Sequence, residues 1–290
     1  MKFAKTIKLF LIDGASNGRI SCELSNWTGK AYKIPRNLIK KCDDRIDLKD
    51  KNCKAVYFLV GKDENNQIVV YIGEAEGILK RLNQHIQSKD FWQEAIIIIS
   101  KDDNLNKAHI KYLENRFYNL AKEANRSKIE NAQIPTKSSI SESDEAEMEE
   151  FLFNVKLLVN TLGYKFFEPI IDEETEQDII QDKTDIFYLK TTRGGNGKGK
   201  PTSEGFVVFE DSEIATSTTP SYFEKMKNLR EQLINDKVIA NENDKLKFTK
   251  DYLFSSASTA AMIITGRSTN GLTAWKLKTG IVLKEYEAPK

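Results

Sequence analysis

The sequence is poor in cysteine and has no long apolar run. Its three cysteines, Cys22, Cys42 and Cys53, are odd in number and show no paired spacing, which argues against a disulfide framework or a zinc site. A reduced, intracellular setting is therefore expected. No apolar run approaches the ~20 residues of a membrane span, and the first residues lack the apolar core of a signal peptide. We expect a cytoplasmic protein with no membrane partner.

The chain also lacks a large net charge. Its 290 residues carry a formal net charge of +1, and the sequence pI is about 7.6. Overall charge therefore provides no basic field for nucleic acid, and any such contact must come from local patches. This length predicts one large domain or two modest ones.

What the sequence does contain is a periodic stretch between residues 55 and 135. Two β-branched and aromatic runs, 55–60 and 67–72, flank a polar turn and predict a hairpin. Apolar residues at helical spacing follow over 74–86, and a continuous apolar run over 94–99 is typical of a buried strand. A second helical stripe covers 106–124. The predicted order is ββαβα.

Five polar residues interrupt these apolar patterns. They are Tyr57, Tyr71, Arg81, His85 and Glu114. Each one alone has an ordinary structural explanation, such as a strand tyrosine with a satisfied hydroxyl or a solvated surface pair. Arg81 and His85, however, are four residues apart and share a helix face. Glu114 borders an apolar stripe, where a carboxylate requires a cation.

Together these residues resemble the GIY-YIG nuclease family, whose catalytic domain is a small ββαβα unit with two tyrosine motifs. The first motif stands here as Ala-Val-Tyr at 55–57 and the second as Tyr-Ile-Gly at 71–73, a full match. Arg81, His85 and Glu114 follow at the expected places. The resemblance covers roughly a third of the chain. It implies a metal-dependent endonuclease. DNA is the expected substrate because members of the family typically cleave DNA.

The resemblance also implies a role for each residue. Glu114 would hold a single Mg²⁺ or Mn²⁺ ion, Tyr57 would activate water, and Arg81 would brace the scissile phosphate. One carboxylate with waters and a phosphate oxygen suits Mg²⁺. A tyrosine titrates near ~10, so Tyr57 would need a nearby cation to act as a base, and His85 is the rival. Tyr71 would orient water or phosphate.

An asparagine that closes the site in the family could be Asn131 or Asn125, and we prefer Asn131. Two features depart from the family pattern. Ala55 and Val56 replace the usual Gly and Ile of the first motif. Glu74, with Glu76 nearby, stands where some relatives carry a basic residue. These two acidic residues remove positive charge from the predicted site.

Residues 1–54 are predicted to be an extension packed on the nuclease domain, with strands at 6–12 and 19–24. Aromatic and basic side chains alternate after them: Trp27, Lys30, Tyr32, Lys33 and Arg36. Such mixing suits stacking on bases beside phosphate contacts. Packing of the aromatic residues against the nuclease domain is the alternative.

Residues 136–184 are predicted to form a linker and a connecting helix. Residues 136–144 are small and polar, without periodicity. Helical spacing resumes over 145–162. The acidic stretch 172–185 would repel phosphate, so we expect a solvated loop there rather than a site.

Residues 185–290 are predicted to form a second, recognition or assembly domain. Runs 186–190 and 205–209 are expected to pair as strands, joined by a glycine-rich loop that contains Arg193, Lys198 and Lys200. Such a loop could contact nucleic-acid phosphates or simply be mobile. It lacks the spacing of a nucleotide-binding motif.

The segment 254–275 resembles a small domain of uncharacterised function often found after GIY-YIG modules in bacterial and phage proteins. Ser255 or Ser256 would cap a helix, and Trp275 would close a core. Arg267 is a candidate DNA contact.

The sequence thus predicts an α+β protein, with a GIY-YIG-like ββαβα nuclease domain at 55–135 and a small mixed α/β C-terminal domain. The predicted function is endonucleolytic cleavage of phosphodiester bonds, most simply in DNA during restriction, defence or DNA processing. RNA as substrate stays open. The alternative is a catalytically weak or inactive protein of the same fold that binds nucleic acid or supports assembly. The sequence leaves the oligomeric state open.

Overall fold

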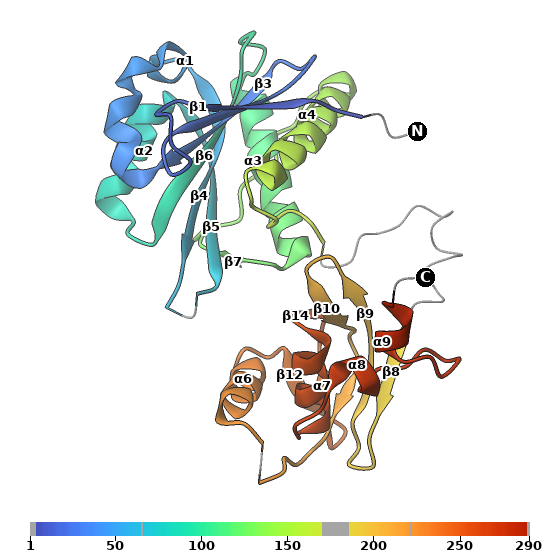
Figure 1. Ribbon diagram of the computed structural model, residues 1–290. Coiled ribbons are helices and arrows are strands. Elements are labelled where there is room, and N and C mark those ends of the chain that lie inside the picture. Colours follow the sequence, from blue (N-terminus) through green and yellow to red (C-terminus); the bar gives the residue numbers. More distant parts are fainter. Residues whose placement is uncertain (1–3, 65, 170–185, 221, 289–290) are drawn as a thin grey trace. The chain divides into compact units, whose positions relative to one another are not determined.

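The computed structural model describes residues 4–64, 66–169, 186–220 and 222–288, and it has an α+β fold. The chain divides into two compact units, Met1–Pro169 and Ile170–Lys290, each built around its own sheet (Figure 1). No helix in the described ranges has the length and apolar character needed to cross a membrane.

The first unit contains seven strands and four α-helices among its described residues. In chain order its elements are β1 (Ile7–Leu11), β2 (Ile20–Leu24), β3 (Gly29–Pro35), the 3₁₀-helix η1 (Arg36–Asp44), α1 (Ile46–Lys49), β4 (Lys54–Lys62), β5 (Ile68–Glu76), α2 (Ile78–Ser88), β6 (Trp92–Ser100), α3 (Lys107–Ala124), β7 (Lys128–Ile129) and α4 (Glu142–Thr161). The predicted ββαβα order is β4, β5, α2, β6 and α3. The remaining elements extend it.

All seven strands belong to one sheet in the order β1-β2-β3-β6-β4-β5-β7. Every pairing is antiparallel except that of β5 with β7. β3 pairs with β6 from Gly29↔Ser100 to Pro35↔Glu94. Residues 1–54 therefore continue the sheet of the ββαβα unit instead of only packing on it. The strand β3 was missed because its two lysines, three positions apart, interrupt the period-2 pattern of a strand.

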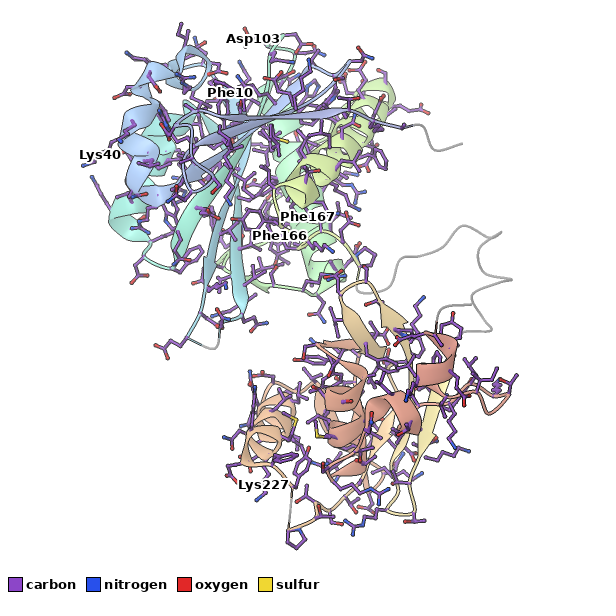
Figure 2. All side chains as sticks on the ribbon, viewed as in Figure 1. Phe10, Lys40, Asp103, Phe166, Phe167 and Lys227 are labelled. Atoms are coloured by element: carbon purple, nitrogen blue, oxygen red, sulfur yellow. The ribbon has the colours of Figure 1, made fainter. Side chains whose placement is uncertain are left out.

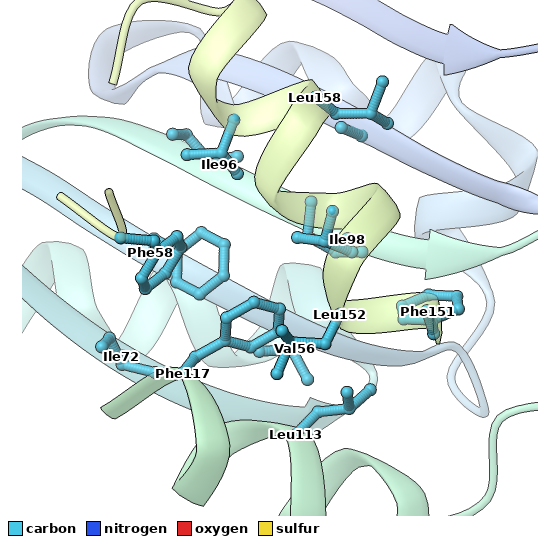
Figure 3. Packing of buried hydrophobic residues seen from close by; sticks show 14 of the residues in the cluster. Val56, Phe58, Ile72, Ile96, Ile98, Leu113, Phe117, Phe151, Leu152 and Leu158 are labelled. Atoms are coloured by element: carbon cyan, nitrogen blue, oxygen red, sulfur yellow. The ribbon is translucent and has the colours of Figure 1, made fainter. Parts of the chain in front are cut away.

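Helices cover both faces of this sheet, which explains its apolar strands. Along β4, Val56 and Phe58 face the core formed with α3 and α4, whereas Tyr57 and Leu59 face the core formed with η1, α1 and α2. The α3–α4 side is shown in Figure 3, where Phe58, Phe117 and Leu152 meet. Because side chains alternate along a strand, a strand buried on both sides shows a continuous apolar run.

The helix α4 belongs to the first unit. Its N-cap residue Ser141 accepts a hydrogen bond from the backbone N–H of Asp144, and its apolar face joins the core of the α3 side. Phe166 and Phe167 follow and extend this core (Figure 2), with the Phe167 ring centroid 5.0 Å from that of Phe58. The linker therefore leads into an integral helix. The acidic stretch 172–185 lies outside the described residues.

The second unit also has seven strands among its described residues, with helices against one face of their sheet. Its elements are β8 (Phe187–Lys190), β9 (Asn196–Thr202), β10 (Gly205–Val208), β11 (Glu213–Ile214), α6 (Glu224–Asn235), β12 (Ile239–Glu242), β13 (Lys245–Phe248), β14 (Tyr252–Phe254), α7 (Ala257–Thr265), α8 (Gly271–Ala274) and α9 (Leu283–Tyr286). The strand order is β12-β13-β11-β9-β10-β14, and β8 pairs with β9.

The predicted pairing of runs 186–190 and 205–209 across a glycine-rich loop is wrong. Most of that loop forms the strand β9, which pairs with both β8 and β10. Glycine is a poor strand former, which hid this strand in the sequence. Here its missing side chain is required for packing. A Cβ atom at Gly197 would lie 2.3 Å from Cδ1 of Ile264 and 3.0 Å from the Trp275 ring.

Two local predictions in this unit are confirmed. The hydroxyl of Ser256 accepts a hydrogen bond from the backbone N–H of Thr259 and caps α7, and Trp275 is fully buried. Asn270 caps the short helix α8, because its side-chain oxygen accepts a hydrogen bond from the backbone N–H of Leu272.

Candidate functional site

The hairpin β4–β5 and the helix α2 position the predicted site in the first unit. Tyr57 on β4 pairs directly with Gly73 on β5, so the two tyrosine motifs lie side by side. The tyrosine rings occupy the space that a side chain at position 73 would need. A Cβ atom there would lie 2.5 Å from the Tyr57 hydroxyl and 2.9 Å from the Tyr71 ring. Glycine at 73 is therefore a packing requirement of the cluster.

Four of the predicted residues meet around the hydroxyl of Tyr57. Its Oη atom lies 2.7 Å from Nε2 of His85, and Nε of Arg81 donates a hydrogen bond to it at 3.3 Å. The Tyr71 ring centroid is 5.2 Å from that of His85 and 6.2 Å from that of Tyr57. Arg81 and His85 lie one helical turn apart on α2, as their spacing predicts.

Burial keeps the central pair of this cluster neutral. It raises the pKa of the Tyr57 phenol well above its usual range, and the nearby Tyr71 adds to this shift, whereas Arg81 opposes it. Burial also lowers the pKa of His85 to about 4, with further contributions from Arg81 and Lys89. At neutral pH Tyr57 is therefore a phenol and His85 an uncharged imidazole, so a resting phenolate does not form at Tyr57.

The outer edge of β5 connects this cluster to Asn131. The backbone carbonyl of Val70 accepts from the N–H of Glu130 at 2.9 Å. Two residues on, the Asn131 amide bonds both backbone groups of Ile72, donating from Nδ2 at 2.7 Å and accepting at Oδ1 at 3.0 Å. The Asn131 side chain thus continues the hydrogen bonding between β7 and β5 by one more position, at Ile72, the residue before Gly73. Asn125, the alternative, is the C-cap of α3.

Glu114 on α3 occupies the next position along the same edge. Backbone groups of alternate residues point to the same edge of a strand, so Glu74 follows Val70 and Ile72 there. Burial and the nearby Glu74 carboxylate raise the pKa of Glu114 to about 7. A hydrogen bond from the Glu74 backbone acts in the opposite direction, and its effect is smaller. Arg81 also lowers this pKa. Glu114 therefore lies near the tyrosine cluster and beside Glu74, where a bound cation would stabilise its ionised form.

Lys107 is a neighbour of this site that the sequence reasoning missed. Its Nζ atom lies 2.7 Å from a carboxylate oxygen of Glu74 and 3.8 Å from one of Glu76. It also lowers the pKa of Glu114. The spacing of Lys107 and Glu114, seven residues on one helix, is the signal that could have placed both on one face. The negative charge of Glu74 is thus paired with the positive charge of Lys107.

The structure uses the aromatic and basic side chains of residues 27–36 for internal contacts. The Trp27 ring packs 4.9 Å from Phe151. Lys30 pairs with Asp47 at 3.0 Å and Lys33 with Glu94 at 3.1 Å. The guanidinium of Arg36 donates to the carbonyls of Ile86, Lys89 and Trp92. Trp27 thus packs within the first unit, and the three basic side chains contact other residues of that unit. Contact of these four residues with nucleic acid stays a prediction.

The basic candidates of the second unit are more open to solvent. Arg193 lies in the turn before β9, Lys198 is exposed on β9, and Arg267 is exposed after α7. Lys200, also on β9, is half-buried.

Metal ligands are sparse in the described ranges. No group of three or more histidine, cysteine, aspartate or glutamate side chains is placed there to hold a metal ion. Glu114 is the carboxylate at the predicted position, and Glu74 is its acidic neighbour. This donor set fits Mg²⁺, which takes few protein ligands and retains several waters.

Comparison with known proteins finds a similarity for part of the chain. Residues 187–287 match a domain of unknown function, DUF4357. Neither the curated proteins nor the solved structures include a match to this sequence. The C-terminal part of the chain is thus similar to a domain of unknown function, which is consistent with the resemblance stated for the segment 254–275.

Proposed function

We propose that the first unit is a metal-dependent endonuclease of the GIY-YIG type that hydrolyses phosphodiester bonds, with DNA as the expected substrate. The observation that carries the proposal is the convergence of Tyr57, Tyr71, Arg81 and His85 around one phenolic oxygen, with Glu114 at the adjoining edge of β5. Such a mixture of proton carriers, a guanidinium and a carboxylate suits phosphoryl chemistry.

The neutral Tyr57–His85 pair supports a proton path for water activation. As the water attacks phosphorus, its proton would pass to Tyr57 while the Tyr57 proton passes to Nε2 of His85, which becomes an imidazolium. The two candidate bases then act in sequence rather than as rivals. The pKa of His85, about 4, leaves Nε2 unprotonated at neutral pH but makes it a weak base, so the negative charge that develops on the attacked phosphate must stabilise the imidazolium.

Arg81 and Glu114 would act on the phosphate itself. Arg81 is half-buried, and one of its outer nitrogens donates to Gln84 at 3.3 Å near the surface. It can turn this group to a phosphate oxygen, because a guanidinium presents several donors. Glu114, with Glu74 beside it, would hold the divalent ion. The ion would supply charge stabilisation to the phosphoryl and leaving oxygens.

Two observations favour the alternative of a binding or assembly protein without turnover. The side chain of Tyr57 is fully buried, so water must approach it from the side of Tyr71 and Arg81, the partly exposed members. Lys107 also holds Glu74 in an ion pair. Tight binding of nucleic acid without cleavage, across several metals and substrates, would establish this alternative.

A cleavage assay separates the two functions. Labelled single- and double-stranded DNA and RNA are incubated with Mg²⁺, Mn²⁺ or EDTA. We expect metal-dependent cleavage that Glu114→Gln, Tyr57→Phe and Arg81→Ala each reduce by about a hundredfold or more, as losses of single catalytic groups do.

Glu123→Gln is the matched control, because Glu123 is an exposed carboxylate on the same helix. It should leave the rate unchanged. Full activity in Glu114→Gln would refute the metal assignment.

A further inference from the structure

The outward face of the second sheet gathers lysines around a tyrosine. In β8, Phe187 and Leu189 are buried in the core beneath the helices. Because side chains alternate along a strand, Tyr188 and Lys190 lie on the opposite face. Tyr188 is half-buried and Lys190 is exposed. This face therefore presents an aromatic ring beside a cation.

Two more lysines flank this tyrosine in one row across the sheet. Tyr188 pairs directly with Lys198 of β9, and on its other side it pairs with Lys276 through an isolated bridge. Side chains of directly paired residues stand on the same face, about 5 Å apart at Cβ. The ammonium of Lys278 lies 5.6 Å from the centre of the Tyr188 ring. Lys278 thus lies at the Tyr188 ring, and Lys190, Lys198 and Lys276 stand on the same face of the sheet. We call these five residues the Tyr188 surface.

Among the described residues, no acidic side chain pairs with the charges of the Tyr188 surface. Lys190, Lys198, Lys276 and Lys278 are all exposed, and none forms an ion pair with a residue in the described ranges. Farther along the sheet, by contrast, Glu213 pairs with Lys245 at 2.7 Å. Like charges held together repel one another. An anionic partner would offset this repulsion.

We propose that the Tyr188 surface binds single-stranded nucleic acid. A base stacks on the Tyr188 ring after the flexible Lys278 side chain moves aside, and the lysines contact the adjoining phosphates. A groove that combines cations with an aromatic platform is the usual design for this ligand. An acidic peptide would need the cations but not the ring. This binding requires no catalysis by the first unit, so it can be correct whether or not the proposed nuclease activity is.

The test measures binding alone. Full-length protein carrying Glu114→Gln is titrated in EDTA against a fluorescein-labelled single-stranded oligonucleotide, as DNA and as RNA, at several salt concentrations. Tyr188→Ala should weaken binding about tenfold or more, whereas Tyr188→Phe retains the ring and should bind nearly as well as the parent. The double variant Lys198→Ala, Lys276→Ala should lower the log–log salt slope by about 1.4, since each phosphate contact contributes about 0.7.

The matched control removes two lysines from the helix side of the unit. Lys225→Ala, Lys227→Ala changes the charge equally on α6, where Figure 2 labels Lys227, and it should leave affinity near that of the parent.

Equal losses in both double variants would show general charge attraction and overturn the proposal. Unchanged binding by a folded Tyr188→Ala would overturn it too. So would displacement of the oligonucleotide by polyglutamate at equal charge concentration, because stacking would then contribute nothing. Thermal unfolding checks the fold of each variant, and the lysine pair decides the question if Tyr188→Ala is unfolded.

Discussion

At the scale of single residues, Glu114 links the electrostatics of the site to the proposed metal. Burial and Glu74 raise the pKa of its carboxyl to about 7. The protonated form therefore predominates below pH 7, and a cation must displace that proton to bind. This coupling distinguishes Glu114 from exposed carboxylates on the same helix, such as Glu123.

We predict that Mg²⁺ or Mn²⁺ affinity rises with pH up to about 7 and then levels off, with a slope near tenfold per pH unit on the acidic side. Calorimetric titration of Mn²⁺ between pH 5.5 and 8.5 measures it, and these limits bracket about one pH unit or more on each side of the shifted pKa. Glu123→Gln should keep the same profile, and Glu114→Gln should abolish the binding. An affinity that is flat across this range would contradict the assignment of Glu114 as the ligand.

At the scale of elements, the sequence predicted the parts that carry strong periodicity or caps. The hairpin of β4 and β5, the helices α2 and α3, and the buried strand β6 all formed near their expected bounds. The missed strands had weaker signals. β3 has two lysines three positions apart, β7 is two residues long, and β9 is rich in glycine. Their pairing depends on distant partners, which no local pattern encodes.

Some residues of the candidate site could likewise be predicted from the sequence, and others could not. Tyr57, Tyr71, Arg81 and His85 could be predicted to converge because two motifs and one helical turn place them. Helical spacing could put Lys107 on the face of Glu114, but its contact with Glu74 could not be predicted, since it joins α3 to β5 across 33 residues of sequence. The neutral state of Tyr57 also follows only from burial, which requires the fold.

Gly73 provides a prediction at this scale, because it joins the backbone of β5 to the tyrosine cluster. Gly73→Ala would place a Cβ atom 2.5 Å from the Tyr57 hydroxyl. We expect a loss of about 1 to 3 kcal/mol in the free energy of unfolding, as for other overpacked sites, and a loss of any cleavage activity. Urea denaturation measures the first effect.

A double-mutant cycle tests its cause. Tyr57→Leu shortens the clashing side chain, so adding Gly73→Ala to Tyr57→Leu should cost clearly less than adding it to the wild type. Equal costs in both backgrounds would place the strain elsewhere, for example in the backbone of β5.

At the scale of the whole molecule, the domain boundaries follow the sheets and not the motif. The sequence predicted a nuclease domain at 55–135 with an extension before it and a linker after it. The structure instead includes both flanks in one compact unit that ends at Pro169. β3 supplies a seven-position ladder to β6, and α4 completes the core of the α3 side. The motif-bearing segment is thus the centre of a larger folding unit.

This arrangement predicts how fragments behave. A fragment of residues 1–169 should unfold cooperatively, because it keeps the whole first sheet and both of its cores. A fragment of residues 55–169 should not, since it loses β3 and leaves the apolar strand β6 as an open edge. It also loses Ile39 and Leu48, which are buried against the α2 side. Thermal unfolding by circular dichroism, with the full chain for comparison, measures the outcome. If the 55–169 fragment melted as sharply and at the same temperature as 1–169, residues 1–54 would be an appendage after all, and the ββαβα segment would be an independent domain.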